Sequence, residues 1–379
     1  MTTDGPYVAR TQDVVTGIFR TDKAARVSFE TYQDRIKRAE PKRGDLLYSR
    51  EGTYFGIAAE VPTDVQVCLG QRMVLIRPNP EKVNFRFLRY WLNSPVMAAH
   101  VHGHRDGSVA ERLNLPTIRS LPVILPGLAE QDAVASVLGA LDDKIAVNQN
   151  IAATADALSH ALFSQHFDTP AGSDPSDWTP GVLSDICSTQ YGYTATSTAA
   201  PVGPRFLRVK DINKNNWIAW PEVPYCEIDD RGLDKYRLSV GDLLVARMAD
   251  PGKSAIVEEE TDAVFASYLV RLKTASLAHS YFVWGFLKSD AYRKYSESAR
   301  SGSVQANMNA KVIVGAQLLI PPTELMETYL GAVMPLRRRL TVSLRESDAL
   351  TALRDTLLPQ LMSGRLRVKD AEKIVEDYA

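Results

Sequence analysis

"LPVILPGLAEQDAVASVLGALDDKIAVNQN" fills residues 121–150, and this stretch decides the fold that the sequence predicts. A short apolar run ends at Pro126, and apolar residues then recur at spacings of three and four. An average spacing of about 3.5 residues is typical of a long helix that packs one seam against another helix. Residues 126–177 hold one basic residue, Lys144, against eight acidic ones, so we expect this helix to face protein and not DNA phosphates.

A second apolar stripe of the same kind lies near the end of the chain. The predicted seam of the first helix holds Val134, Leu138, Leu141, Ile145, Asn148 and Leu162, and that of the second holds Val333, Leu336, Leu340, Leu350, Leu357 and Leu361. Two such stripes satisfy each other most simply as an antiparallel coiled coil, in which one buried Asn can fix the register. The alternative is that each helix packs on its own domain. At about 1.5 Å per residue, a helix of about 40 residues makes a spacer of roughly 60 Å.

The chain also repeats itself in order. "GPYVARTQDV" from Gly5 matches "GPRFLRVKDI" from Gly203, and "GSVAERLN" from Gly107 matches "GSVQANMN" from Gly302. Other matched pairs keep this order while the offset drifts from 198 to 192 residues. A fixed period is the signature of a repeated structural unit. The sequence therefore predicts two copies of a globular domain followed by a long helix.

Each globular copy mixes two kinds of pattern. Apolar runs of four to seven residues alternate with Gly, Pro and Asp turns, which indicates short strands, and "NFRFLRYWLNSPVMAAHV" has helical spacing. The predicted fold class is α+β, with two repeated α/β domains separated by two long antiparallel coiled-coil helices. The predicted bounds are a first domain at 1–126, a helix at 127–168, a second domain at 178–321, a helix at 323–364 and a tail at 365–379.

Composition limits the possible functions. The 379 residues are 45% hydrophobic and carry a formal net charge of −1, but residues 1–125 hold 18 basic against 13 acidic residues. No apolar run reaches about 18 residues and no secretory signal opens the chain, so we expect no membrane span. The three cysteines form no CxxC pair, which indicates reduced thiols and a cytoplasmic protein.

The motifs of common catalytic sites are incomplete. "PGKS" at Pro251 lacks the first glycine of a phosphate loop, because Arg247 stands at that position. "HVHGH" has no cysteine or acidic cluster beyond Asp106 to complete a metal site. A glycine-rich cofactor loop and an Asn-Pro-Pro-aromatic motif for amino-methyl transfer are also absent from the sequence. We therefore expect no catalytic residue, metal or cofactor in this chain.

At this point the sequence resembles a known family. The first helix with its proline-ended strand, and the closing "LRDTLLPQLMSGRLRV", look like the specificity (S) subunit of type I restriction-modification systems, which act in phage defence. The resemblance covers nearly the whole chain, and its features are Glu130-Gln131, Leu141-Asp142, Lys144-Ile145, Asn148, Leu357-Leu358-Pro359, Leu361 and Ser363-Gly364.

The resemblance implies a division of labour. Each copy would be a target recognition domain that reads one half of a bipartite double-stranded DNA site. The helices would set the gap and dock two modification (methyltransferase) subunits, which methylate adenine N6 with S-adenosylmethionine. A restriction/translocase subunit using ATP and Mg would join some assemblies. The chain itself would be a non-catalytic subunit.

One departure from the repeat is visible. The second domain opens with residues 178–202 before its "GPRF", whereas the first domain begins almost directly at "GPYV". About 20 residues of the unit are therefore missing. The true start lies upstream, or the first domain is incomplete, or the tail replaces the lost piece. Because the offset places Trp178 opposite Asp370, we take substitution by the tail as a hypothesis.

Residues that could read DNA are expected in Gly-punctuated segments where strands end, since a few side chains reach base edges while Lys, Arg and small polar groups contact phosphates. The first-domain candidates are Arg50, Tyr54, His102, His104, Arg105, Ser108, Arg112 and Asn114. The second-domain candidates are Arg208, Lys210, Asn213, Lys214, Asn216, Arg247, Lys253, Ser254, Arg300, Ser303, Gln305 and Asn307. For any single position, an ordinary solvated loop residue remains the alternative.

Two other functions stay open at this stage. A coiled-coil protein-interaction adaptor would use the same helices without sequence-specific DNA reading, and its assembly would show no salt-dependent DNA binding. A self-contained nuclease or methyltransferase would need the motifs that the sequence lacks.

Overall fold

The computed structural model describes residues 2–15, 17–52, 55–103, 112–167, 177–300 and 307–378, and the side chain of Arg300 is not described. The chain divides into two compact units, which are presented one at a time: residues 1–146 with 349–379 form the first, and residues 147–348 form the second. Both long helices run through both units. No helix of the described residues is long and apolar enough to cross a membrane.

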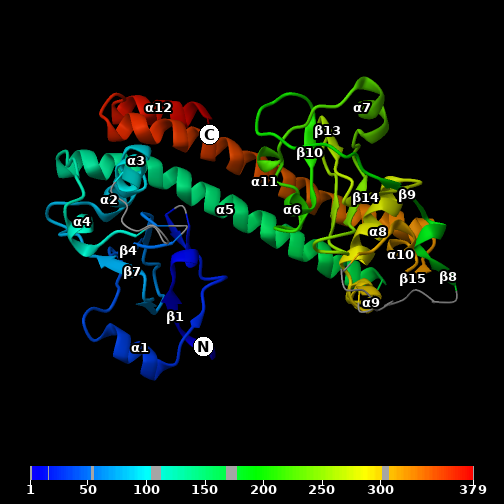
Figure 1. Ribbon diagram of the computed structural model, residues 1–379, viewed down its shortest axis with the longest axis horizontal. Helices are drawn as coiled ribbons and strands as arrows, with labels where there is room; N and C mark the ends of the chain where they lie inside the picture. Colours follow the sequence, from blue (N-terminus) through cyan, green and yellow to red (C-terminus); the bar gives the residue numbers. More distant parts are fainter. Residues whose placement is uncertain are drawn as a thin grey trace. The chain divides into compact units, whose positions relative to one another are not determined.

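Among its described residues, the first unit carries three small sheets and, counting η1, five short helices ahead of the long one. Figure 1 shows their arrangement. Its elements in chain order are β1 (Thr2–Ala9), η1 (Thr11–Asp13), β2 (Val14–Val15), β3 (Ile18–Phe19), α1 (Phe29–Ile36), β4 (Leu46–Ser49), β5 (Ala58–Glu60), β6 (Val67–Leu69), β7 (Met73–Ile76), α2 (Phe85–Leu92), α3 (Pro95–Gly103), α4 (Leu115–Arg119), the start of α5 (Leu128–Phe167), the end of α11 (Thr323–Met362) and α12 (Val368–Tyr378). The sheets are antiparallel β5-β4-β7, parallel β1-β6 and the hairpin β2-β3.

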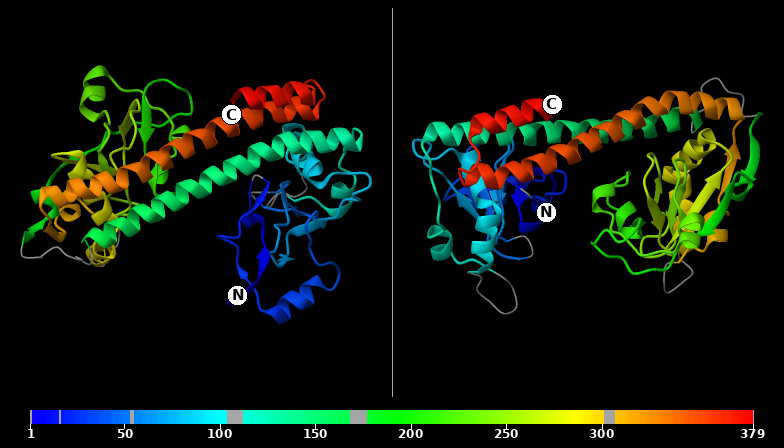
Figure 2. Two further views of the ribbon diagram at one scale, coloured as in Figure 1. Left: turned by 180° about the vertical axis from the view of Figure 1, so that it is seen from behind. Right: turned by 90° about the horizontal axis from the view of Figure 1, so that it is seen from above.

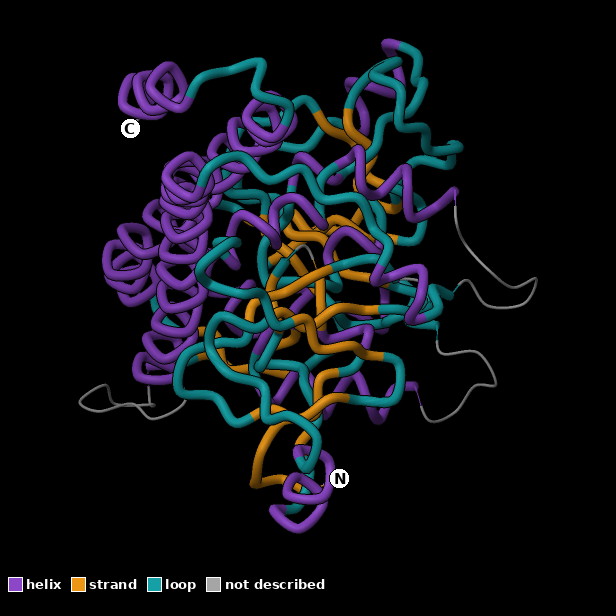
Figure 3. The backbone as a smooth tube through the Cα atoms, turned by 90° about the vertical axis from the view of Figure 1, so that its left-hand side faces the viewer, coloured by secondary structure: helices purple, strands orange, loops and turns teal. Residues whose placement is uncertain are grey.

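The second unit repeats this plan with two additional strands at its start. Its elements are the end of α5, β8 (Thr179–Val182), η3 (Leu183–Asp185), β9 (Cys187–Tyr191), β10 (Arg205–Leu207), α6 (Val209–Ile212), η4 (Trp220–Glu222), α7 (Asp230–Tyr236), β11 (Leu243–Ala246), β12 (Ser254–Ile256), β13 (Ala263–Phe265), β14 (Leu269–Thr274), α8 (Leu277–Lys288), α9 (Asp290–Arg300), α10 (Ala310–Ile313), β15 (Gln317–Ile320) and the start of α11. The sheets are antiparallel β12-β11-β14-β9, parallel β10-β13 and antiparallel β15-β8. Strands are short and loops take up much of each unit (Figure 3).

The repeat is visible in matched elements. The central strands β4 and β11 each follow a Gly-Asp turn, and Gly44 and Gly241 have φ of 93° and 90°. Side chains other than Gly rarely adopt this left-handed conformation, so the same turn is built twice by the same residue. The predicted fold class, two repeated α/β domains with two long antiparallel helices, is confirmed.

The two long helices have the same length and pair in opposite directions. Each spans 40 residues, α5 over Leu128–Phe167 and α11 over Thr323–Met362. In the first unit the beginning of α5 packs against the end of α11, as Figure 1 allows the reader to follow. In the second unit Ala152 and Ala155 of α5 pack against Leu340 of α11. This order of contacts makes the pair antiparallel.

The helix seams pack against the globular parts as well as against each other. Both alternatives, a helix pair and packing of each helix on its own domain, therefore apply. Phe87 and Tyr90 of α2 share one apolar cluster with the predicted seam residues of the first unit. Phe163 and Val333 belong to the main core of the second unit, which includes most of α8. Ten of the twelve predicted seam residues are buried, and Leu162 and Leu336 are half-buried. These side chains are used inside the chain, so a partner would have to meet other residues of the helices.

An ion pair joins the two helices in each unit, half-buried in the first unit and buried in the second. In the first unit Arg354 Nη1 of α11 lies 2.8 Å from Asp142 Oδ1 of α5. In the second unit Arg337 Nη1 of α11 lies 2.6 Å from Asp156 Oδ1 of α5. Burial raises the pKa of Asp142, but its arginine partners, Arg89 first, hold that pKa below its ordinary value. The Asp142 carboxylate therefore stays charged at neutral pH.

Asn148 is the buried amide that the seam pattern predicts. Its side chain is 1% exposed, and neither amide atom has a hydrogen-bond partner among the described residues. The hydroxyls of Ser343 and Ser347 on α11 are buried and unpartnered in the same way. A helix seam that tolerates such polar groups loses stability but disfavours other registers, as the sequence pattern suggested.

The tail forms a helix and not a strand. Ala371 of α12 is fully buried, and Val368 and Val375 pack against the cluster formed by α2, α5 and α11 in the first unit. Figure 2 shows α12 doubling back beside the end of α11. It takes part in no sheet of the described residues. The tail therefore does not supply the strands that the first domain lacks, and the hypothesis that it replaces them is wrong.

We expect Gly285→Ala to destabilise the second unit. A Cβ on Gly285 of α8 would lie 2.1 Å from the Phe163 ring of α5, far inside van der Waals contact. Overpacking of this kind costs roughly 2 kcal/mol because the ring cannot yield in a packed core. Urea unfolding followed by tryptophan fluorescence would detect it, since Trp178, Trp217, Trp220 and Trp284 lie in this unit.

The matched control is Gly331→Ala on α11, where a Cβ meets nothing within 4 Å. Because alanine is the better helix former by about 1 kcal/mol, this control should stabilise the chain slightly. Equal unfolding midpoints for Gly285→Ala and the parent chain would contradict the packing described between α5 and α8.

Candidate nucleic-acid interface

The same salt-bridged turn follows β1 in the first unit and β10 in the second. Arg10 Nε lies 2.8 Å from Asp13 Oδ2, and Arg208 Nε lies 2.8 Å from Asp211 Oδ2. The remaining Arg208 donors reach Asp211 Oδ1 at 2.9 Å and Ser197 Oγ at 3.1 Å. The geometry gives Arg208 a structural role, and its predicted DNA contact stays a prediction.

The two units diverge directly after this turn. In the first unit the chain continues into the hairpin β2-β3, with Val14 opposite Phe19. In the second unit the helical turn α6 ends and the amide-rich loop 213–217, "NKNNW", follows. The scaffold is therefore repeated while the loop that it presents is not.

A basic hollow of about 330 Å³ lies beside this loop in the second unit. It is lined by Ala153, Asp156, Ile212, Asn213, Lys214, Asn215, Asn216, Trp217, Lys253 and Lys288. Lys214 Nζ is paired with Glu222 Oε2 at 2.8 Å, which leaves Lys253 and Lys288 beside one carboxylate, that of Asp156. That carboxylate is already bound by Arg337 and by Asn216 Nδ2 at 2.7 Å. The excess of positive charge and amide donors suits an anion of phosphate size.

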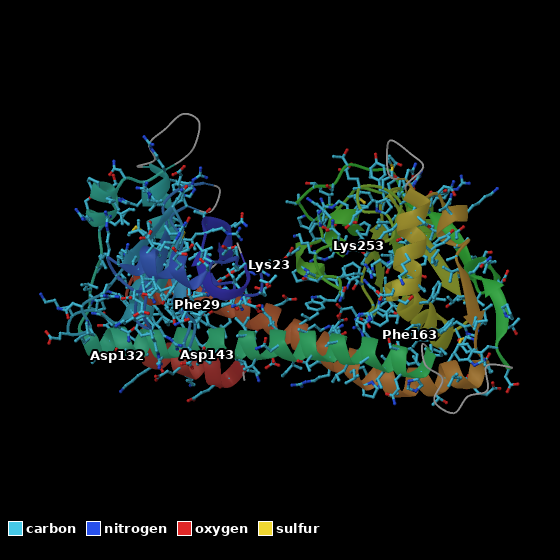
Figure 4. The ribbon with its side chains drawn as sticks, turned by 90° about the horizontal axis from the view of Figure 1, so that it is seen from below. Lys23, Phe29, Asp132, Asp143, Phe163 and Lys253 are labelled. Carbon is cyan, nitrogen blue, oxygen red and sulfur yellow. The ribbon has the colours of Figure 1, made fainter. Side chains whose placement is uncertain are left out.

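Lys288 is the innermost cation of this hollow. Its Nζ donates to the Ser254 carbonyl at 2.6 Å. Burial lowers the pKa of Lys288 to about 8, against the opposing effect of Asp156, and Lys253 lowers it further. The ammonium is still protonated at neutral pH but is short of negative neighbours, and a bound anion would relieve that. Lys253, labelled in Figure 4, is exposed on the loop before β12.

A second hollow of about 650 Å³ adjoins α6 and shares Asn213 with the first. Aromatic side chains line it, among them Tyr193, Phe206 and Tyr268, and Tyr268 is 56% exposed. Lys210 contributes a charge to this lining. Aromatic faces next to cations and amides suit the sugars and bases of nucleic acid.

Arg50 and Arg247 occupy matching places after β4 and β11. The Arg50 carbonyl accepts from the Leu113 N–H at 2.8 Å, and the Arg247 carbonyl accepts from the Met308 N–H at 2.9 Å. The Arg247 guanidinium lies 4.9 Å from the centre of the Tyr191 ring, and its Nε has no hydrogen-bond partner among the described residues. Both arginines are half-buried at a strand end, as the sequence predicted.

Three other candidates of the first unit have local structural partners. His102 is exposed on α3, where Nδ1 hydrogen-bonds with the Ala98 carbonyl at 2.7 Å. Arg112 is exposed beside a backbone bridge to Glu51. Asn114 caps α4, since its Oδ1 accepts from the Thr117 N–H at 2.8 Å. An amide committed to a helix cap is a weaker DNA candidate than the sequence suggested.

Several candidates lie outside the described residues, namely Tyr54, His104, Arg105, Ser108, Ser303 and Gln305, together with the side chain of Arg300. Asn307 is described and exposed. The prediction that Ser254 contacts DNA is wrong, because Ser254 is fully buried in β12 and its hydroxyl cannot reach DNA. The "PGKS" loop ends where β12 enters the core, so Lys253 is exposed while the next residue, Ser254, is buried.

The structure thus gathers Asn213, Lys214, Asn216 and Lys253 of the predicted set into one hollow. It adds Lys288 and Asn215, which sequence reasoning missed. Lys288 closes an apolar helical stretch and resembles an ordinary solvent-facing helix end, so only the fold brings it to the loop. Asn215 stood inside "KDINKNNW", where the amide-rich composition was the available signal.

The chain is similar to known proteins over most of its length. Residues 5–156 match the family described as type I restriction modification DNA specificity domain. The MjaIX specificity subunit of Methanocaldococcus jannaschii, a type I restriction enzyme subunit, is 23% identical over 355 residues, which are 87% of this chain and 79% of the relative. The HindI specificity subunit of Haemophilus influenzae is 20% identical over 402 residues, covering 86% of this chain and 87% of the relative.

A solved structure shares the fold. The crystal structure of the type I restriction-modification S subunit from M. genitalium superposes with a TM-score of 0.57 at 14% identity, over 94% of this chain and 92% of the other. Residues 5–156 thus match the type I restriction modification DNA specificity domain, and the chain is similar over most of its length to specificity subunits of type I restriction enzymes.

Proposed function

We propose that the chain reads a bipartite double-stranded DNA sequence, with one half-site for each unit. The observation that carries this proposal is the repeated turn with unequal loops. Arg10–Asp13 and Arg208–Asp211 hold the same turn at 2.8 Å, yet a hairpin follows the first and loop 213–217 follows the second. A common frame with different side chains is what two different half-sites require, because base edges are read by a few projecting groups.

Within the second unit, we assign the phosphate contact to the basic hollow of Lys214, Lys253 and Lys288. Asn213 lines both hollows and Lys210 lines the second, and these two residues are the candidates for base edges. Phosphate contacts fix the register of a protein on DNA, and neighbouring base contacts then supply specificity. The near-neutral net charge of −1 means that partners would have to add phosphate contacts for tight binding.

We also propose the partners and their chemistry. Two modification subunits would dock on the exposed faces of α5 and α11 and methylate adenine N6 with S-adenosylmethionine. A restriction subunit, in assemblies that include one, would bring ATP and Mg. The chain would contribute sequence recognition and the spacing between the half-sites, without a catalytic group. The family match and the specificity subunits named above support this proposal.

A methylome tests the proposal. The neighbouring methyltransferase is expressed in a methylation-free host with and without this chain, and N6-methyladenine is mapped across the genome. We expect a bipartite motif that appears only when the chain is present, because the methyltransferase alone would not recognise a specific DNA sequence. Methylation that ignores the chain, with an active partner, would favour the adaptor function instead.

Lys253→Ala should weaken DNA binding by the chain–methyltransferase assembly without changing its preferred sequence. Loss of one phosphate contact costs about 1 kcal/mol, a roughly fivefold rise in Kd, and lowers the slope of log K against log salt by about 1. Fluorescence anisotropy at several salt concentrations measures both effects.

The matched control is Lys273→Ala, which removes an exposed lysine of β14 that does not line either hollow. It should leave affinity and salt slope nearly unchanged. If the two variants behave alike, the basic hollow is not a phosphate site.

A further inference from the structure

A second turn lies beside the salt-bridged turn in each unit. β1 pairs with β6 in the first unit and β10 with β13 in the second, and because these strands run parallel, the strands of each pair end at the same edge. The Gly70 N–H after β6 donates to the Ala9 carbonyl at 2.8 Å. The Ala266 N–H after β13 donates to the Leu207 carbonyl at 2.9 Å. The turns after β6 and β13 are therefore equivalent parts of the repeat.

Arg72 and Tyr268 are equivalent exposed residues of these two turns. The Arg72 carbonyl accepts from the Arg50 N–H at 3.1 Å. In the second unit the Tyr268 carbonyl accepts from the Arg247 N–H at 3.0 Å. The side chains of Arg72 and Tyr268 are 60% and 56% exposed. The same backbone position thus presents an arginine in the first unit and a tyrosine in the second.

A second pair of equivalent positions lies directly after the central strands. Glu51 follows the strand-end arginine of β4, and Met248 follows that of β11. The next residue has a positive φ in both units, 91° at Gly52 and 64° at Ala249. Since the chain leaves the two strands through the same left-handed turn, Glu51 and Met248 occupy matching places.

The side chains at these two positions come together in each unit but differ in chemistry. In the first unit Arg72 Nε lies 3.2 Å from Glu51 Oε1. In the second unit Met248 and Tyr268 both line the hollow of about 650 Å³. A charged pair in the first unit is therefore replaced by an uncharged pair in the second, on the same backbone frame.

The charged pair matches a base edge better than a phosphate. Its carboxylate cancels the charge of the guanidinium, so the pair would gain little from neutralising a phosphate. In the major groove a G·C pair shows guanine O6 and N7 as acceptors and the cytosine N4 amine as a donor. With Nε facing Glu51, Arg72 can donate to guanine through its Nη atoms, and the Glu51 carboxylate can accept from cytosine.

The uncharged pair matches a different base edge. Met248 and Tyr268 bring no charge to a phosphate, and Ala249 and Ala266 beside them make this part of the lining apolar. The C5-methyl of thymine is the apolar group that the major groove presents, and apolar side chains read it by contact. The second unit therefore suits an A·T pair at the place where the first unit suits a G·C pair.

We infer that these two positions determine DNA specificity in both units. Glu51 and Arg72 select a G·C pair in the half-site of the first unit. Met248 and Tyr268 select an A·T pair in the half-site of the second unit. The inference rests on the proposed function, because it names side chains that read a base within each half-site.

The test compares methylomes made by the methyltransferase with variants of the full chain in the methylation-free host. Arg72→Leu should lower the preference for one G·C pair, in one half of the motif, by about tenfold or more, since a bidentate arginine supplies discrimination of that size. Tyr268→Ala should relax one A·T pair in the other half. Both side chains are exposed, so the fold should be kept, and the unaffected half of the motif is the internal control.

The matched control is Arg43→Leu, which removes an exposed arginine ahead of β4, at the opposite end of that strand from Arg50. This variant should leave both halves of the motif unchanged, because Arg43 belongs to neither of the two equivalent positions.

Three results would overturn the inference. Arg72→Leu could lower methylation at every site without changing the motif, which would make Arg72 a phosphate contact. Arg72→Leu and Tyr268→Ala could relax the same half of the motif, or neither could change it. If the parent chain itself confers no motif, the proposed function fails and takes this inference with it, so the two failures are distinguishable.

Discussion

The two helix–helix ion pairs are the interaction on which the rest of this structure depends. The acid lies on α5 and the base on α11 in both units, at Asp142–Arg354 and Asp156–Arg337. A buried charge is tolerated only next to its partner, so a shifted register would leave charges unpaired at considerable cost.

Each ion pair also reaches into its own globular part. Asp142 accepts from Arg89 and Tyr90 of α2, at 2.8 and 2.6 Å. Arg337 donates to Glu258 at 2.7 Å through Nε and again through Nη2, and its guanidinium lies 4.5 Å from the centre of the Trp284 ring on α8. The networks thus fasten α2 and α8 to the helix pair. The loops that differ between the units are left outside this frame, where sequence can change without loss of the fold.

The sequence predicted the parts of this arrangement that depend on periodicity. The heptads predicted two helices of about the observed length. The repeated Gly-Asp turns predicted that β4 and β11 occupy matching positions in the two units. It could not predict the ion pairs, because Asp156 and Arg337 are 181 residues apart and each looks like a solvated helix residue. Burial explains the misjudged Ser254, since a serine after a glycine turn resembles a loop residue until its strand is placed in a sheet.

The candidate interface shows the same limit. Composition pointed to "KDINKNNW", but the hollow beside it needs Lys288 from the end of α8 and Asp156 from α5, which only tertiary packing brings together. Arg208 and Asn114 carry the right chemistry for DNA, yet local hydrogen bonds occupy them. Residue type alone does not separate a side chain that caps a turn from one that projects beyond it.

The central claim is that each unit reads its own half of the DNA site. The most direct measurement is a map of N6-methyladenine produced with the methyltransferase and a chain carrying Lys210→Ala and Asn213→Ala. The account predicts that one half of the bipartite motif relaxes while the other half and the spacing are kept. A motif that changes in both halves, or in neither, would contradict it.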